Sequence, residues 1–377
     1  MKYLQRRAQE WLVEIPEVRE EPVFHECGKR AVWYSGVDGK LNFAWIGIPE
    51  GASPERKVPG IVLVHGGGGT AFANWADLWE KRGYAVIAMD TCGAFPDTRG
   101  QYNNWPRHSF SGPAGWGAFG EQAALPPGDQ WFTHAVASII KATTVLSRLP
   151  EVDADRIGMT GISWGAVLSI IAAGLDPRIK ALSAVYGCGF LQELERAWRP
   201  ELQAMTEEQR NWWTGEWDPS NFLSGIRCPV QWFAATNDLA FDLPRWNKTA
   251  CLVPGDRCMK VRWVHGHGIP GEAPREIEAF MNEHLRGGKK RILLTDMQCD
   301  GHRISASVSE GTVLAAHLQA AFGSGLWQDC EWITLNAECR DGKISAVLPE
   351  GWSAAYLSVV SDDLLFSSSE AAFPEKS

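Results

Sequence analysis

The stretch RIGMTGISWGAVLSII, residues 156–171, decides the fold of this chain. Its first residues form the apolar run of a buried strand, and its last residues place apolar side chains at the spacing of a helix. Ser163 lies between the two, with Gly161 two positions before it and Gly165 two positions after it. A turn this sharp strains the backbone at the serine, and side chains at the two flanking positions would collide. The stretch therefore predicts a nucleophile elbow, in which a serine hydroxyl is lifted out of the sheet.

The segments around this unit alternate between buried strands and helices. A hairpin is indicated by the apolar/polar alternation of 30–48, and a short amphipathic helix by residues 1–13. Strands separated by helices of this length indicate right-handed crossovers and a mainly parallel sheet. The predicted strands are 58–69 including its closing glycines, 84–90, 156–161, 179–187, 228–236 and 259–264, and the predicted helices are 70–83, 129–149, 164–176 and 274–285.

The sequence pattern changes after the charged linker GGKKR, residues 287–291. From 291 to about 366 the chain consists of short alternating runs separated by turn residues, which is typical of a small antiparallel β-sandwich. We therefore expect an α/β domain at 1–288, with an insertion at 190–225, and a C-terminal β-sandwich at 289–377.

A serine hydroxyl is a poor nucleophile without a base, and the base needs an orienting acid. In this topology they follow in the order serine, acid, histidine at the ends of later strands. Asp238 comes just past a predicted strand and is the expected acid, whereas Asp242 is better placed to cap the next helix. His267 has glycine on each side and lies far enough past the next strand to swing over the serine. His265, nearer the strand end, is the alternative base.

An oxyanion that forms on a bound acyl group needs two donors. The Trp164 amide and the positive end of the helix that it opens would supply the first. The second is expected from the HGGGG run at 65–69, where Gly66 and Gly67 allow the backbone to approach a reacting centre closely. A phosphate-cradling loop is the weaker alternative for this run, because the chain has no GxxxxGK and no GxGxxG with an acidic partner.

Composition excludes several classes of partner. The net charge of −9 and the absence of a Lys/Arg run argue against nucleic-acid binding. No apolar run approaches the roughly 20 residues of a membrane span, and the N-terminus lacks the apolar core of a secretory signal. The cytoplasm is therefore the expected location. The nine cysteines form no CxxC pair and are expected to be mostly small buried residues.

Tryptophan is unusually abundant, with 19 residues. The long segments 91–128 and 190–225 carry YNNW (102–105), GPAGWG (112–117) and NWWTGEW (211–217), and they are expected to roof a pocket. Aromatic walls with Asn and Gly suit a small acyl group on a bulky alcohol such as a carbohydrate. The alternative is that these indoles only pack the insertion against the rest of the protein.

Together these residues resemble the α/β-hydrolase superfamily over roughly residues 30–287. Within it they are similar to the branch of acetyl xylan esterases, dienelactone hydrolases and prolyl-oligopeptidase-type catalytic domains, for which VDADRIGMTGISWG (152–165) is typical. The resemblance implies an eight-stranded sheet flanked by helices, with Ser163, Asp238 and His267 as catalytic triad and no cofactor; we expect no metal either. The C-terminal β module and the absence of an N-terminal propeller depart from the common patterns of the branch.

The sequence thus predicts a serine carboxylic-ester hydrolase that works through an acyl-enzyme on short-chain, acetyl-type esters. Its expected partner is a small-molecule ester, with acylated carbohydrates among the candidates, and neither a nucleic acid nor a membrane. Two alternatives stay open: a peptidase or amidase of the prolyl-oligopeptidase type, and a non-catalytic binding protein on a hydrolase scaffold. The oligomeric state is not indicated by the sequence.

Overall fold

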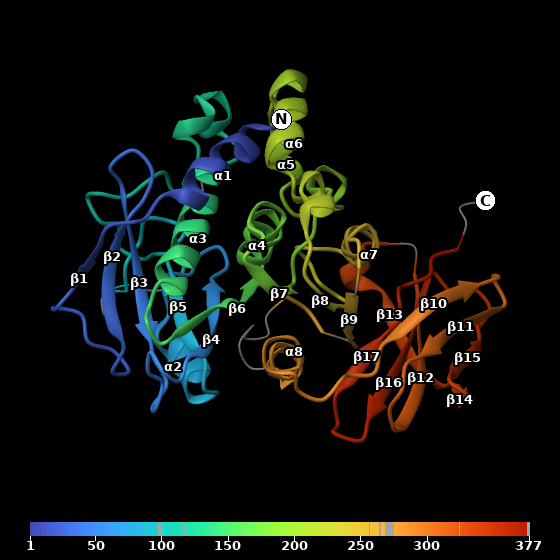
Figure 1. Ribbon diagram of the computed structural model, residues 1–377. Helices are drawn as coiled ribbons and strands as arrows, with labels where there is room; N and C mark the ends of the chain where they lie inside the picture. Colours follow the sequence, from blue (N-terminus) through green and yellow to red (C-terminus); the bar gives the residue numbers. More distant parts are fainter. Residues whose placement is uncertain are drawn as a thin grey trace.

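The computed structural model describes residues 1–96, 100, 102–115, 118–255, 257–263, 265–267, 275–323 and 325–374 of the chain. Its main feature is one long twisted sheet with helices against both faces (Figure 1). In the described residues this sheet holds thirteen strands, in the spatial order β1-β2-β3-β5-β4-β6-β7-β8-β9-β17-β16-β12-β13. Its first nine strands along the chain are β1 (Val18–Glu20), β2 (Arg30–Ser35), β3 (Leu41–Gly47), β4 (Val58–Val64), β5 (Ala85–Met89), β6 (Val152–Ile162), β7 (Ile179–Val185), β8 (Val230–Ala235) and β9 (Arg257–Arg262).

The strands β5, β4, β6, β7, β8 and β9 run parallel, and the hairpin β2–β3 joins them antiparallel through β5. Every residue of β5 and β8 is buried, because helices cover both faces, and this explains their continuous apolar runs. Strands β2 to β9 supply the expected eight strands, and the short β1 adds to their edge. The predicted α/β architecture is confirmed.

The helices lie in two layers, with α1, α3, α4 and α7 on one face of the sheet and α2 and α8 on the other (Figure 1). Their cores are separate apolar clusters, one per face. All the predicted helices are present, although residue 274, the first of the last one, lies outside the described residues. The α-helices are α1 (Tyr3–Val13), α2 (Ala73–Lys81), α3 (Trp131–Ser147), α4 (Trp164–Leu175), α5 (Arg199–Ala204), α6 (Glu207–Trp217), α7 (Leu243–Cys251) and α8 (Arg275–Arg286). No helix of the described residues is long and apolar enough to cross a bilayer.

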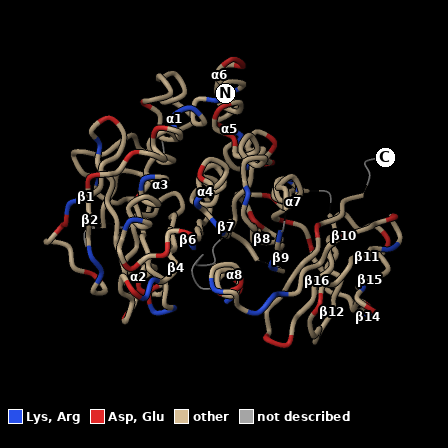
Figure 2. Tube along the Cα trace, in the orientation of Figure 1, with Lys and Arg blue, Asp and Glu red and all other residues tan. Residues whose placement is uncertain are grey.

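The insertion at 190–225 folds into α5, α6 and short 3-10 turns that pack onto the α3–α4 face. The indoles of Trp213 and Trp217 are fully buried and donate to the Ala118 carbonyl and the Gln130 side chain. These two tryptophans therefore pack the insertion down, as the alternative interpretation held, and do not form an open aromatic wall. The tube in Figure 2 shows basic and acidic positions interspersed along the described part of the chain.

The C-terminal part is the predicted β-sandwich, but one of its two sheets is the continuation of the central sheet. Strand β17 pairs antiparallel with β9, Ser368 opposite Met259, and β16, β12 and β13 follow. A separate four-stranded sheet, β10-β11-β15-β14, packs against β12 and β16 around its own apolar core. These strands are β10 (Leu294–Cys299), β11 (Arg303–Val308), β12 (Val313–Phe322), β13 (Glu331–Asn336), β14 (Glu338–Arg340), β15 (Lys343–Val347), β16 (Ala354–Ser361) and β17 (Phe366–Ser368).

Two aromatic side chains of this C-terminal part, Trp332 and Tyr356, belong to the large core of the α/β part. Cutting the chain after residue 288 should therefore leave β9 as an open edge and remove these contacts, at about 2–3 kcal/mol for each buried aromatic side chain. We expect the fragment 1–288 to melt about 10 °C or more below the full chain, and to aggregate. Calorimetry and light scattering measure both effects. An unchanged melting temperature with a monomeric fragment would contradict this prediction.

Candidate active site

Ser163 lies at the junction of β6 and α4 in a left-handed backbone conformation, with φ 57° and ψ −123°. The strain is sustained by the packing of the turn, and the Ser163 amide donates to the Val185 carbonyl at 2.8 Å. A Cβ atom at Gly161 would lie 2.3 Å from the Gly165 carbonyl oxygen, and one at Gly165 would lie 2.1 Å from that of Val64. The two glycines are therefore sterically required, as the sequence predicts.

Three of the expected residues lie in one hydrogen-bonded chain. The Nδ1 atom of His267 lies 3.0 Å from Oδ2 of Asp238, and its Nε2 atom lies 3.0 Å from Oγ of Ser163. A carboxylate only accepts, so Nδ1 carries the proton and Nε2 is left to accept from the serine hydroxyl. This is the tautomer that a base for Ser163 requires.

Asp238 lies three residues past the end of β8, and its carboxylate is almost completely buried. Its second oxygen accepts from the amides of Ala240, at 2.7 Å, and Phe241, at 3.0 Å, so its direction is fixed from both sides. Asp242 caps α7 instead, because its side chain accepts from the Arg245 amide at 3.1 Å. Burial raises the pKa of the Asp242 carboxyl. The structure thus places Asp238 against His267 and Asp242 at the start of α7.

The structure places His267, and not His265, between Ser163 and Asp238. The His267 ring is held between the rings of Tyr186 and Phe241, with centroids 5.7 and 5.9 Å away. The side chain of His265 makes no hydrogen bond to any described residue and faces a separate groove. Gly268, one of the two glycines that favour His267 in the sequence, lies outside the described residues.

The glycine run after β4 lies against the serine, since a Cβ atom at Gly66 would come within 3.1 Å of that of Ser163. The carbonyls of the run are held from one side by the YNNW segment. Tyr102 Oη donates to the Gly67 oxygen at 2.9 Å, and Trp105 Nε1 to that of Gly68 at 3.0 Å. The amide of Gly67 makes no hydrogen bond within the described part of the chain. The Trp164 amide is likewise unused by its own helix, because it is the first residue of α4.

His65 contacts the glycine run of the site, which the sequence analysis did not predict, although it opens the HGGGG motif. It is almost fully buried. Its Nδ1 atom donates to the Gly66 carbonyl at 2.7 Å, while Nε2 accepts from the Thr91 amide at 2.9 Å. The imidazole therefore ties the glycine run to the end of β5. The signal was available: a histidine directly before a glycine run can order it by bonding to its backbone.

A small cavity of about 20 Å³ lies beside the Trp164 amide and the glycine run. A volume of this size holds about one water-sized group. Burial raises the pKa of the Cys92 thiol to about 12, so this sulfur stays protonated and is no rival nucleophile. Trp116 and Gly117 of the GPAGWG segment lie outside the described residues. The cavity is lined by Gly67, Gly68, Cys92, Gly115, Trp131 and Trp164.

The arrangement joins a hydroxyl, an oriented imidazole and a buried carboxylate next to two unused amides. Such a set can transfer an acyl group by way of the serine oxygen. In the described residues, no three His, Cys, Asp or Glu side chains gather so as to hold a metal ion.

Comparisons with known proteins agree with this architecture. A family model for acetyl xylan esterase (AXE1) matches residues 23–214. Dipeptidyl-peptidase 5 of Porphyromonas gingivalis is 28% identical over 276 residues, which are 71% of this chain and 34% of that protein. Acetyl esterase Axe7A of Xylanibacter ruminicola is 25% identical over 166 residues, 41% of this chain and 36% of that protein. The chain thus spans about a third of the length of these relatives.

Solved structures support the fold. The acetyl xylan esterase from Paenibacillus sp. R4 superposes with a TM-score of 0.62 at 20% identity, and the match covers 75% of this chain and 93% of that one. The uncovered quarter of this chain leaves room for the C-terminal β-sandwich outside the match. At this identity the similarity shows a common α/β-hydrolase fold, as the sequence predicts.

The elbow generates a paired steric prediction. Gly165→Ala should disrupt the turn, because the added methyl group would meet two backbone carbonyls, of Val64 and His65, that cannot move aside cheaply. We expect loss of esterase activity and a lower melting temperature. Gly215→Ala, within α6, is the matched control, because the new methyl group meets open space and removes a helix glycine. This control should melt at the same or a higher temperature. Equal behaviour of the two variants would contradict the steric argument.

Proposed function

Because the chain belongs to the acetyl xylan esterase (AXE1) family, we propose that it is a serine carboxylic-ester hydrolase that works through an acyl-enzyme. The observation that carries the proposal is the chain of two 3.0 Å contacts from Asp238 through His267 to Ser163. The family match over residues 23–214 includes Ser163 but ends before Asp238 and His267, so the geometry adds these two residues to what the family match supports.

The chemistry follows from the tautomer of the imidazole. His267 Nε2 removes the hydroxyl proton as Ser163 Oγ attacks the ester carbonyl carbon. Asp238 keeps Nδ1 protonated and stabilises the imidazolium that forms. His267 then gives the proton to the oxygen of the leaving alcohol, and the carbon–oxygen bond breaks. A water molecule, deprotonated by the same nitrogen, hydrolyses the acyl-enzyme and returns the serine.

The negative charge on the tetrahedral intermediate needs donors already in place. We assign this role to the amides of Trp164 and Gly67, with Gly66 shaping the approach. Both amides lack another acceptor in the described structure. The Trp164 amide also lies at the N-terminus of α4, where the helix dipole is positive. His65, Tyr102 and Trp105 fix the opposite, carbonyl side of the glycine run, and thereby keep its amides directed at the site.

The size of the cavity beside these amides supports a short acyl group. A space of about 20 Å³, which holds about one water-sized group, suits a methyl group next to the carbonyl better than a longer chain. We therefore propose acetyl-type esters as substrates. An acylated carbohydrate is a suitable alcohol part, in line with the acetyl xylan esterase family and the acetyl esterase of Xylanibacter ruminicola.

The second candidate function is that of a peptidase or amidase. The similarity to dipeptidyl-peptidase 5 favours it, since the matched segment covers 71% of this chain. Hydrolysis of aminoacyl amides faster than of acetyl esters would select this candidate. A non-catalytic binding protein on a hydrolase scaffold is disfavoured. If the site had lost its activity, mutation would be expected to have removed at least one member of the hydrogen-bonded triad.

Ser163→Ala tests the mechanism. Loss of the nucleophile should lower kcat/KM for p-nitrophenyl acetate by about 10⁴-fold or more, while the melting temperature stays close to that of the wild type. Steady-state kinetics and calorimetry measure the two effects. Retention of normal activity in this variant would contradict the assignment of Ser163 as the nucleophile.

Cys92→Ala tests the acyl cavity. Removing the sulfur enlarges the cavity beside Gly115. The ratio of kcat/KM for propionate esters to kcat/KM for acetate esters should therefore rise by about tenfold, the low end of the discrimination that one methylene group gives. Cys299→Ala on the exposed edge of β10 is the control and should leave the ratio unchanged. An unchanged ratio in Cys92→Ala would show that another surface limits the acyl chain.

A further inference from the structure

A groove of about 380 Å³ lies where β9 meets the C-terminal strands. We call it the junction groove. One wall comes from the end of β9 and from Trp263 and His265, which follow it shortly before His267. The other wall comes from the face of β12 and β16 that is turned away from the separate four-stranded sheet. The groove is lined by Val261, Arg262, Trp263, His265, His317, Gln319, Tyr356, Ser358, Val360 and Phe366.

The described side chains that line this groove include one arginine and two histidines, and no acidic residue. The Arg262 guanidinium lies 6.0 Å over the Phe233 ring and pairs with no carboxylate among the described residues. The side chains of His265 and His317 make no hydrogen bond within the same residues. Among the residues that the structure describes, no Asp or Glu lines the groove, although the chain as a whole has a net charge of −9. An unpaired arginine with two imidazoles and no acid favours an anionic ligand, and a carboxylate matches the arginine fork.

The remaining lining suits a hydroxyl-rich ligand. Trp263 at the rim is 51% exposed, so a face of its indole is open for stacking. Ser358 and Gln319 offer polar groups deeper in the groove, and Thr334 holds the Gln319 side chain at 2.6 Å. An apolar, ring-stacking rim together with polar walls is the pattern expected for a saccharide.

The groove shares a chain segment with the triad, because its lining residue His265 lies on the same loop as His267. His265 is two residues from His267, and its carbonyl accepts from the amide of Asn237, the residue before Asp238, at 3.0 Å. The rings of Tyr186 and His267 lie with their centroids 5.7 Å apart, and the Tyr186 ring in turn contacts Phe233, over which the Arg262 guanidinium lies. The small acyl cavity is built from other segments, the glycine run and the ends of α3 and α4. A ligand in the junction groove can therefore be the alcohol part of an ester whose acyl part occupies that cavity.

We propose that the junction groove binds the alcohol part of the substrate and selects an acidic saccharide, one whose carboxylate pairs with Arg262. The inference rests on the proposed esterase function. It gives the C-terminal strands a role in substrate choice, because they supply six of the ten residues named as lining the groove.

The test compares an O-acetylated oligosaccharide that carries a uronic acid with the same oligosaccharide after reduction of its carboxyl to the alcohol. The wild type should prefer the acidic form by about tenfold in kcat/KM, mainly through KM, as a charge-assisted pair predicts. Arg262→Gln should bring this ratio close to one. His317→Gln, on a separate strand, should lower the wild-type preference for the acidic form by about threefold. This variant replaces the first one as the test if Arg262→Gln does not fold.

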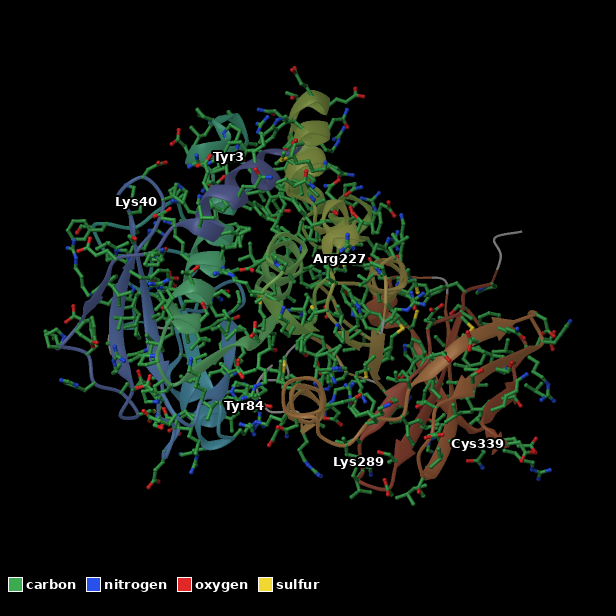
Figure 3. All side chains as sticks on the ribbon, in the orientation of Figure 1. Tyr3, Lys40, Tyr84, Arg227, Lys289 and Cys339 are labelled. Atoms are coloured by element: carbon green, nitrogen blue, oxygen red, sulfur yellow. The ribbon has the colours of Figure 1, made fainter. Side chains whose placement is uncertain are left out.

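Arg227→Gln is the matched control. Arg227, labelled in Figure 3, precedes β8 at the amino end of the parallel strands, whereas Arg262 lies at the carboxyl end of β9. This variant should keep the wild-type ratio. A wild-type ratio near one, together with hydrolysis of p-nitrophenyl acetate that Ser163→Ala abolishes, would overturn the inference while the esterase function stands. A tenfold ratio that survives both groove variants would overturn it as well. Absence of any hydrolysis by the wild type would instead count against the proposed function.

Discussion

The site depends on one strained residue, Ser163, which is held at positive φ between a buried strand and a helix. This conformation is possible because positions 161 and 165 carry no side chain, and the backbone carbonyls of Val64 and Gly165 fill the space. The strain directs the hydroxyl to the carboxyl edge of the parallel sheet. All the other groups of the site reach it from that edge: Asp238 and His267 follow β8 and β9, and the glycine run follows β4. The catalytic groups thus come together because the carboxyl ends of neighbouring parallel strands lie at the same edge of the sheet.

The central sheet continues through β9 into strands from the far end of the chain, so the C-terminal sandwich is fused to the α/β part. Lys260 on β9 is buried at this junction and is tied to the Phe366 carbonyl and Ser367 of the C-terminal strands. Burial lowers the pKa of its ammonium group. This continuity fixes the groove walls relative to the triad, which a flexible linker would not do. The fusion therefore bears on substrate choice as well as on stability.

Much of this arrangement could be predicted from the sequence, because local patterns determine it. The elbow, the order of acid and base, the cap at Asp242 and the alternation of strands and helices are all properties of short segments. The choice between His265 and His267 was open, since it depends on the path of a loop. Contacts between distant segments were not foreseen. The bonds from Tyr102 and Trp105 to the glycine run, and the pairing of β17 with β9 more than a hundred residues away, leave no periodic trace in the sequence.

The most direct test of the account is covalent labelling with an alkyl fluorophosphonate, followed by intact-mass measurement and peptide mapping. The account predicts one phosphonyl group per chain, attached to the peptide that contains Ser163, and slower labelling when His267 is replaced by alanine. Labelling of a different residue, or no labelling of a preparation that hydrolyses acetyl esters, would contradict it.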